Sequence, residues 1–402
     1  MNSQKSKIIS GNSRVVRNIN RSVILNIIRQ KQPISRVKIA RLTNLNKSTV
    51  STIVTRLLEE KLLCEEQIVD KNVGRNPYHL TINAKAHFVG GLYIDSRKTQ
   101  ISIFDIAGHQ IGSAAIKTES GLGEKFIALC IDKLNELQHE HSIAHLKGIG
   151  VSVAGIVDPV NATVLHAPSL GWDNFAIGEI IKRLFPSMEN IKVENGGKAS
   201  ALAELWFGNQ QTDLKDFVFL SVSSGLGTGI VIDQKLVDGV HYSAGEFGHL
   251  TLFEGGESCS CGNRGCWEAY ASDKSTVQRY MLKTGKMDNG ASPIAMQDII
   301  HFARNGEEAA IQILEEKGHY LGLGIAGIVK VIDPQKIIVG GKVTQVWDLI
   351  YPHIDKVVKR KSFLGQFREI IIEPSTLTLQ PRLLGAATLA IKEIFSDFRI
   401  TV

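Results

Sequence analysis

Two neighbouring stretches carry the most information about the fold: Gly245-Glu246-Phe247-Gly248-His249 and Cys259-Ser260-Cys261-Gly262-Asn263-Arg264-Gly265-Cys266-Trp267-Glu268. One histidine and three cysteines fall within eighteen residues, and the cysteines are spaced Cys-x-Cys-x4-Cys around two glycines. Glycine lets a backbone fold back on itself. Histidine and cysteine are the side chains that bind structural zinc, four to each ion. The sequence therefore predicts one zinc ion held by His249, Cys259, Cys261 and Cys266.

Two carboxylates, Glu246 and Glu268, lie in the same stretches. A zinc ion that fixes this part of the chain would also present them to a ligand. The other two of the five cysteines, Cys64 and Cys130, are isolated, unlike the cysteines of a secreted disulfide scaffold. The alternative is a chance cluster in a reducing cytosol.

The same residues resemble the ROK family, which takes in repressors, sugar kinases and unassigned reading frames. The resemblance runs from about residue 84 to the C-terminus. Within the family, Cys-Gly-Asn-Arg-Gly-Cys-Trp-Glu at 261–268 is most similar to the xylose repressor subgroup. The resemblance implies a two-lobed actin/hexokinase-like fold with a sugar in the cleft between the lobes.

Length and composition agree with a globular chain. With 402 residues, 43% hydrophobic and 21% charged, the chain is long enough for two or three domains. No apolar run is long enough to cross a membrane, and the basic N-terminus lacks the apolar core of a signal peptide. We expect a cytoplasmic protein with no membrane partner.

The net charge of +6 hides an asymmetry. Residues 1–58 contain twelve Lys or Arg and no Asp or Glu, so the rest of the chain sums to −6. A solvated helical face usually mixes both signs, and a long stretch without acids favours a polyanionic partner. Double-stranded DNA is the expected partner, and the alternative is a merely basic tail.

A helix-turn-helix pattern lies inside this basic segment. We expect helices over Val15–Arg29, from a Ser35 cap to Leu42, and over Lys47–Glu60, with a turn at Thr43-Asn44-Leu45. Apolar residues at helical spacing from Val50 to Leu58 form the core-facing stripe of the third helix. Its other face carries cations and small hydroxyl groups, which suit a helix lying in the major groove. The predicted DNA-binding residues are Ser35, Arg36, Lys47, Ser48, Ser51, Thr52, Arg56 and Arg75.

The last of these residues belongs to an expected wing. Strands over Leu62–Val69 and Tyr78–Ile82 would be joined by a turn that holds Arg75 between a glycine and a proline. An arginine there can enter the adjacent minor groove. A lone arginine in a turn is more often simply solvated. DNA-binding members of the ROK family carry a similar Gly-Arg-x-Pro, which supports the wing assignment.

The remainder reads as α/β and contains a duplication. Phe88–Asp105 and Phe217–Asp233 each read as strand, tight turn, strand, and each half later has an apolar strand ending in glycine. We expect a winged helix-turn-helix at 1–82 and a ROK sugar-kinase-like effector domain at 83–402. Lobe one would take about 83–193 and the C-terminal helix at about 382–402. Lobe two, with the zinc site, would take about 194–381.

The motifs of the family's kinases are incomplete. Their first turn reads Asp-x-Gly-Gly-Thr, whereas here Arg97 and Lys98 replace both glycines between Asp95 and Thr99. Their general base is the aspartate of Glu-Asn-Asp-x-Asn, and Gly196 takes that position here. Loss of a general base costs roughly 10²- to 10⁴-fold in rate. The sequence predicts no catalytic residue and no kinase activity, although the glycine-rich turn at 223–229 is kept.

The sugar-binding residues are better preserved. By resemblance, Asn195, Glu246, His249 and Glu268 match family residues that hydrogen-bond sugar hydroxyls. A histidine that binds zinc through one ring nitrogen has its other nitrogen fixed as a donor. Ala154 and Ser169 depart from the family pattern, so the resemblance does not determine which sugar binds. An alternative is a zinc ion that only stabilises the fold, with no sugar bound.

These observations predict a sugar-responsive repressor, with xylose as the first candidate effector and a dimer or tetramer as the assembly. Sugar would close the cleft and change the spacing of two recognition helices. Three alternatives stay open at this point: a sugar kinase with an appended DNA-binding domain, a zinc-sensing regulator, and a regulator whose signal is a protein.

Overall fold

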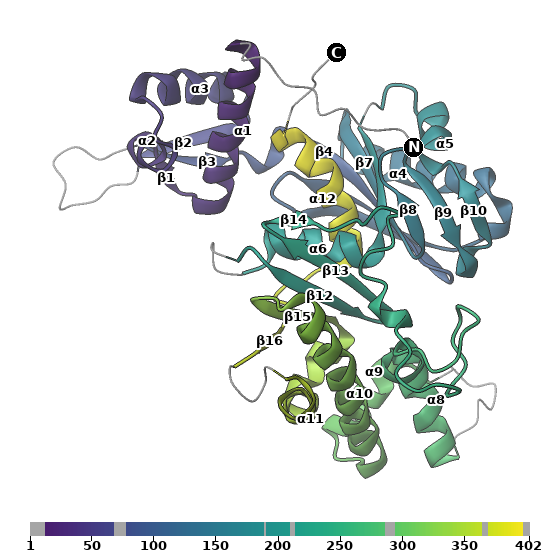
Figure 1. Cartoon of the computed structure of the whole chain (residues 1–402). Coiled ribbons are helices and arrows are strands. Elements are labelled where there is room, and N and C mark those ends of the chain that lie inside the picture. Colours follow the sequence, from purple (N-terminus) through teal and green to yellow (C-terminus); the bar gives the residue numbers. More distant parts are fainter. Residues whose placement is uncertain are drawn as a thin grey trace.

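The computed structural model describes residues 13–67, 78–188, 190–209, 214–285, 294–363 and 369–396. A small N-terminal unit of helices and a hairpin lies beside a body built on two large sheets (Figure 1). Among these residues, no helix combines the length and apolar character needed to cross a bilayer.

The N-terminal unit has three helices and a three-stranded sheet of order β1-β3-β2. The predicted helices and hairpin are confirmed, and the short strand β1, which pairs antiparallel with β3, was not predicted. This is the element order of a winged helix-turn-helix. The elements are α1 (Ser13–Lys31), β1 (Ile34–Ser35), α2 (Arg36–Thr43), α3 (Lys47–Glu59), β2 (Leu63–Gln67) and β3 (Tyr78–Ile82).

Local chemistry explains the boundaries of these helices. The Ser35 side chain accepts a hydrogen bond from the backbone N–H of Lys38 and so caps α2. Asn44 ends the helix in the left-handed conformation, with φ of 55°. On α3, Val50, Val54 and Leu57 are fully buried, as their helical spacing predicts.

The first large sheet has the order β11-β7-β4-β5-β6. β7 runs parallel to both β4 and β11, while β4, β5 and β6 form an antiparallel meander. A smaller antiparallel sheet, β10-β9-β8, adjoins it. The elements are β4 (Phe88–Ile94), β5 (Lys98–Asp105), β6 (Gln110–Lys117), α4 (Glu124–Glu140), β7 (Leu146–Val153), β8 (Ile156–Asp158), β9 (Thr163–Ala167), β10 (Trp172–Phe175), α5 (Ile177–Leu184) and β11 (Ile191–Asn195).

The second large sheet, of order β14-β13-β12-β15-β16, repeats the antiparallel hairpin and parallel third strand of the first. The duplication read from the sequence is therefore present in the fold. The elements are α6 (Gly196–Phe207), β12 (Phe217–Val222), β13 (Leu226–Ile232), β14 (Lys235–Leu236), α7 (Glu268–Ala271), α8 (Asp273–Thr284), α9 (Met296–Arg304), α10 (Glu308–Ile332), β15 (Lys336–Gly341), α11 (Trp347–Lys361), β16 (Ile371–Pro374) and α12 (Pro381–Ser396).

Helices α6 and α12 lie between the two large sheets (Figure 1). α12 packs on β4 and β7, α6 packs on β12 and β13, and the two helices pack on each other. Their contacts need small residues. A Cβ atom on Gly150 of β7 would lie 1.7 Å from the carbonyl oxygen of Ala386 on α12. The layer order is therefore sheet, helix, helix, sheet, which joins the two halves.

Candidate metal centre and ligand cleft

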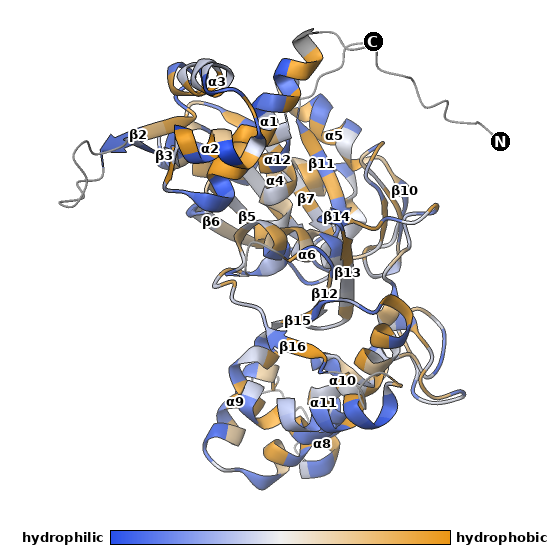
Figure 2. Cartoon of the chain, turned by 60° about the vertical axis from the view of Figure 1, so that its left-hand side comes forward, coloured by the Kyte–Doolittle hydropathy of each residue, from blue (hydrophilic) through white to orange (hydrophobic). Residues whose placement is uncertain are grey.

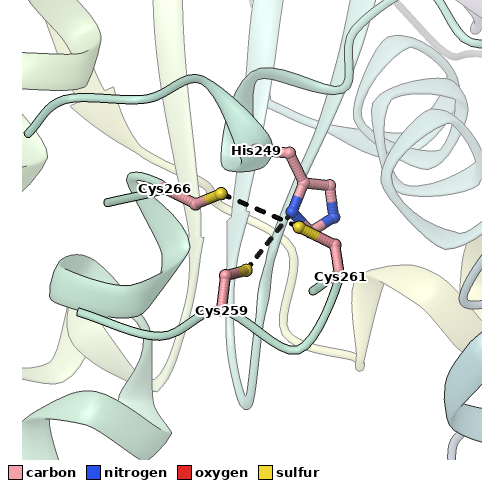
Figure 3. Close-up of side chains that lie close together, drawn as sticks. All are labelled: His249, Cys259, Cys261 and Cys266. Atoms are coloured by element: carbon pink, nitrogen blue, oxygen red, sulfur yellow. Dashed lines mark hydrogen bonds between the residues drawn. The ribbon is translucent and has the colours of Figure 1, made fainter. Parts of the chain in front are cut away.

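Four side chains form one compact group: His249, Cys259, Cys261 and Cys266 (Figure 3). Their ligand atoms all lie within 4.8 Å of one another. Cys259 Sγ is 3.6 Å from His249 Nδ1, and Cys261 Sγ is 3.7 Å from Cys266 Sγ. Around a tetrahedral ion with metal–sulfur bonds of about 2.3 Å, two sulfurs lie about 3.8 Å apart and a sulfur and a nitrogen about 3.6 Å apart. The group could therefore hold a metal ion.

Glycines shape the backbone around the cysteines. Gly262 and Gly265 have φ of 89° and 82°, which glycine adopts without strain. A Cβ atom on Gly265 would lie 1.7 Å from the carbonyl oxygen of Phe253, so only glycine fits there. The Cys259 N–H donates to the Asn263 carbonyl at 2.9 Å and closes the loop. These turns bring the three cysteine sulfurs close to one another.

The metal group is tied to the second glycine-rich turn by Glu268, the first residue of α7. One carboxylate oxygen accepts from the Leu226 N–H at 2.8 Å, and the other accepts from the Ser260 hydroxyl at 3.1 Å. A Cβ atom on Gly225 would lie 2.4 Å from this carboxylate. Glu268 therefore links the cysteine loop to the start of β13. Sequence reasoning missed the role of Ser260.

Glu246 lies on the other side of His249. Its carboxylate is 4.0 Å from His249 Nε2, the ring nitrogen that faces away from the cysteines. Burial raises the pKa of the Glu246 carboxyl, while His249 and then Lys198 act in the opposite direction. An imidazole nitrogen and a carboxylate therefore lie side by side, and both are groups that can hydrogen-bond a hydroxyl.

Asn195 ends β11 and caps α6. Its side-chain oxygen accepts from the backbone N–H groups of Gly197 at 2.7 Å and Lys198 at 3.3 Å. Its amide nitrogen donates to the Gly155 carbonyl at 2.8 Å, which leaves one N–H for a ligand. The side chain is thus held rigidly between the two halves of the body.

Lys198 is a residue that sequence reasoning missed, and it fixes the loop before Glu246. Its side chain is 2% exposed, and Nζ donates to the Tyr242 carbonyl at 3.0 Å and to the Asp238 carboxylate at 3.2 Å. These contacts anchor the loop that leads into Glu246. A lysine after two glycines at a helix start was the only available signal.

Arg382 is the second residue that sequence reasoning missed. It lies on the first turn of α12, where Nε donates to the Ser221 hydroxyl at 3.2 Å and a terminal nitrogen donates to the Tyr93 hydroxyl at 2.8 Å. Tyr93 in turn donates to Asp95, in the turn that replaces the kinase motif. Arg382 therefore joins β12 of the second sheet to β4 of the first. An arginine opening an otherwise apolar helix was the available signal.

The predicted DNA-binding side chains differ in their exposure and in their contacts. Lys47, Ser48, Thr52 and Arg56 are exposed on α3 and Ser51 is half-buried. α3 lies at the end of the molecule farthest from α10 and α11 (Figures 1 and 2). Ser35 caps α2, and Arg36 pairs with Glu65 of β2 at 3.1 Å. Arg75 falls outside the described residues.

Comparison with known proteins places this architecture in a family. The model of the ROK family matches residues 89–393. The xylose repressor of Caldicellulosiruptor bescii is 31% identical over 396 residues, which cover 96% of this chain and 98% of that protein. The DNA-binding transcriptional dual regulator NagC of Escherichia coli is 26% identical, over 89% of this chain and 88% of its own.

Two solved structures agree with this placement. A ROK family transcriptional regulator described as a homolog of the E. coli MLC protein has the same fold, with a TM-score of 0.79 over 95% of this chain and 97% of its own, at 24% identity. A ROK family glucokinase from Streptomyces griseus, in complex with glucose and AMPPNP, is 28% identical, with a TM-score of 0.66 over 76% of this chain and 99% of its own. The chain belongs to the ROK family.

Proposed function

We propose that this protein is a sugar-responsive transcriptional repressor that binds operator DNA and lacks kinase activity. The observation that carries the proposal is an N-terminal unit of three helices and a hairpin in one chain with a ROK-family fold, in which Gly196 takes the position that the resemblance assigns to the kinases' general base. Similarity to proteins named xylose repressor over nearly the whole chain supports it. Xylose is the first candidate effector.

The proposed DNA-binding unit spans 1–82, and the effector domain spans 83–402. Support for the first comes from the exposed polar face of α3 and from the absence of Asp and Glu before residue 59. Hydroxyl groups of Ser48, Ser51 and Thr52 would read base edges, while Lys47 and Arg56 would contact phosphate. Because Arg36 pairs with Glu65, its part in phosphate binding requires that this ion pair open.

The proposed sugar site consists of Asn195, Glu246, His249 and Glu268. Asn195 and Glu268 are held in place by hydrogen bonds to the backbone, and preorganised polar groups reject ligands that lack the matching hydroxyls. The proposed metal is one structural zinc ion on His249, Cys259, Cys261 and Cys266. Zinc would fix the His249 ring and supply no chemistry, so Nε2 stays oriented toward Glu246 and the cleft.

The second candidate function is a sugar kinase with an added DNA-binding domain. Similarity to the Streptomyces griseus glucokinase favours it. Against it, Gly196 cannot accept a proton, and Arg97 and Lys98 stand where the family's kinases have glycines. A coupled assay of ADP release with a panel of sugars separates the two functions.

The proposed assembly is a homodimer or tetramer that places two recognition helices on a two-fold symmetric operator. Sugar binding would close the cleft and change their spacing. A ligand shifts such an equilibrium only through its different affinity for the two states.

The test is fluorescence anisotropy on DNA from upstream of the protein's own gene, at fixed salt, with and without xylose, glucose and N-acetylglucosamine. We expect tight binding that one sugar weakens. Lys47→Gln should weaken binding and lower the salt slope by about one phosphate contact, whereas Lys330→Gln, an exposed lysine on α10, should change neither. Absence of DNA binding, or sugar-dependent ADP release, would contradict the proposal.

A further inference from the structure

Helices α6 and α12 run side by side from the cleft to the DNA-binding unit. At the cleft, Asn195 caps α6, and Arg382 on α12 lies next to Gly196. At the opposite ends, the rings of Trp206 on α6 and Phe395 on α12 meet edge to face, with centroids 5.4 Å apart. Both helices therefore begin beside the proposed sugar site, and their C-terminal ends contact each other.

The far ends of both helices contact α1, the first helix of the DNA-binding unit. The Arg29 guanidinium lies 4.0 Å from the centroid of the Trp206 ring, and one of its nitrogens donates to the Trp206 carbonyl at 3.1 Å. Ser22 donates to the Phe395 carbonyl at 2.8 Å. A single helix, α1, thus contacts the C-terminal ends of both α6 and α12.

Helices α6 and α12 pack tightly on each other. A Cβ atom on Gly385 of α12 would lie 2.1 Å from the carbonyl oxygen of Ala199 on α6, so the two backbones are in direct contact. Residues 196–204 of α6 are all buried. Close-packed interiors transmit displacement because they do not compress. With a rise of about 1.5 Å per residue, α6 reaches about 18 Å from the cleft.

A pocket lies beside the junction with α1. Its volume is 530 Å³, and it is lined by Asn26 and Arg29 of α1, by Trp206 and Phe207 of α6 and by Phe395 of α12. The Arg29 Nε atom is buried there without a hydrogen-bond partner among the described residues. Burial lowers the pKa of the Arg29 guanidinium to about 10. The Arg29–Trp206 contact therefore lies at the edge of a pocket and leaves one guanidinium N–H unused.

A shift of α1 would carry the recognition helix with it. Ile24, Leu25 and Ile28 of α1 share one buried core with Val50 and Val54 of α3, and the same core includes Ala203 of α6 and Phe395 of α12. A displacement of α6 and α12 would therefore reach α1 and α3 through packed side chains.

We propose that the Arg29–Trp206 contact couples the sugar cleft to the DNA-binding unit, with the α6–α12 pair as the connecting element. Arg29 is a positioning residue: it touches neither sugar nor DNA. This role rests on the proposed function. It specifies how a change at the sugar site would reach the DNA-binding unit. Linkage requires that the same contact let DNA alter sugar affinity by the same factor.

The experiment measures the DNA dissociation constant with and without saturating xylose, or whichever sugar of the panel acts, for wild type, Arg29→Gln, Arg29→Lys, Trp206→Phe and Arg21→Gln. Arg21 is the matched control, because it lies on α1 but pairs with Glu60 inside the DNA-binding unit. Circular dichroism and calorimetric sugar titration verify folding and sugar affinity.

We expect the sugar to change the wild-type DNA dissociation constant by about fivefold or more, which is typical of coupled sites. Arg29→Gln should reduce this ratio to below about twofold while sugar affinity and sugar-free DNA affinity stay within about threefold of wild type. Arg29→Lys should recover the wild-type ratio only in part. The planar guanidinium of arginine can stack on the Trp206 ring and donate a hydrogen bond at the same time, whereas the ammonium group of lysine cannot stack. Arg21→Gln should keep the full ratio.

Two kinds of failure are distinguishable. A folded Arg29→Gln and a folded Trp206→Phe that both keep the wild-type ratio would overturn the coupling role and leave the proposed function intact. A wild-type ratio of one with every sugar, despite tight DNA binding, would overturn the sugar response itself and the coupling role with it.

Discussion

The side chain of Arg382 lies against Gly196, the residue that by resemblance stands where the family's kinases have their general base. A Cβ atom on Gly196 would stand 3.3 Å from Cδ and 3.5 Å from Nε of Arg382. Arg382 is 7% exposed, and its guanidinium is held by Ser221 and Tyr93 from the two sheets. A fixed cation therefore lies beside Gly196.

Gly196→Asp should consequently fail to create a kinase. The new carboxylate would form an ion pair with Arg382, which favours the ionised form but withholds it from a sugar hydroxyl. A free general base contributes roughly 10²- to 10⁴-fold. We expect sugar-dependent ADP release within about tenfold of background for Gly196→Asp. Turnover at the level of a working kinase would show that Arg382 does not block the position.

Removal of one cysteine should release the metal and loosen the loop that carries Glu268. Cys261→Ser should lower bound zinc from about one ion per chain to less than about 0.1, measured by elemental analysis, because structural sites need all four ligands. The melting temperature should fall with it. Cys64→Ser is the matched control, since Cys64 lies on β2 far from the metal group. A fully metallated Cys261→Ser protein would contradict the assignment.

The stability of the protein should fall between pH 4.5 and about 7 because of Glu194. Burial raises the pKa of its carboxyl from 4.5 to about 7, against the opposing effects of Lys198 and the Asn195 N–H. In that window the folded chain holds a proton that the unfolded chain has lost, so stability decreases as pH rises. A shift of this size corresponds to roughly 3 kcal/mol.

The measurement is urea unfolding at several pH values. Glu194→Gln should flatten the slope between pH 5 and 7, whereas Glu179→Gln, an exposed carboxylate on α5, should leave it unchanged. If stability changed with pH as steeply in Glu194→Gln as in the wild type, the pH dependence would come from other groups.

Gly385→Ala should destabilise the fold because the new methyl group would separate α12 from α6. The Cβ atom meets backbone, the Ala199 carbonyl, which cannot rotate away. Overpacking of this kind costs roughly 1–3 kcal/mol. Gly327→Ala on α10 is the matched control, because its Cβ atom would lie 3.7 Å from Leu250 and should stabilise the helix by up to about 1 kcal/mol. If Gly385→Ala and Gly327→Ala changed the melting temperature equally, the tight contact between α6 and α12 would be refuted.

The sequence by itself determined the local features of this protein. The cap at Ser35, the apolar stripe of α3 and the repeated strand–turn–strand pattern all follow from residue types a few positions apart, which local backbone chemistry controls. The spacing of His249 and the three cysteines likewise predicted a metal group, since four good ligands within eighteen residues need only short turns to meet. The sugar-binding and DNA-binding assignments stay predictions.

Only the tertiary structure decided which distant residues meet. Arg382 reaches Tyr93 across 289 positions and Ser221 across 161, and Arg29 reaches Trp206 across 177. No periodicity in the sequence encodes such pairs, because they arise when α6 and α12 pack between two sheets and leave their ends at fixed places. The metal group can be read along the chain. The contacts of α1 with the ends of α6 and α12 form only once the helices are packed.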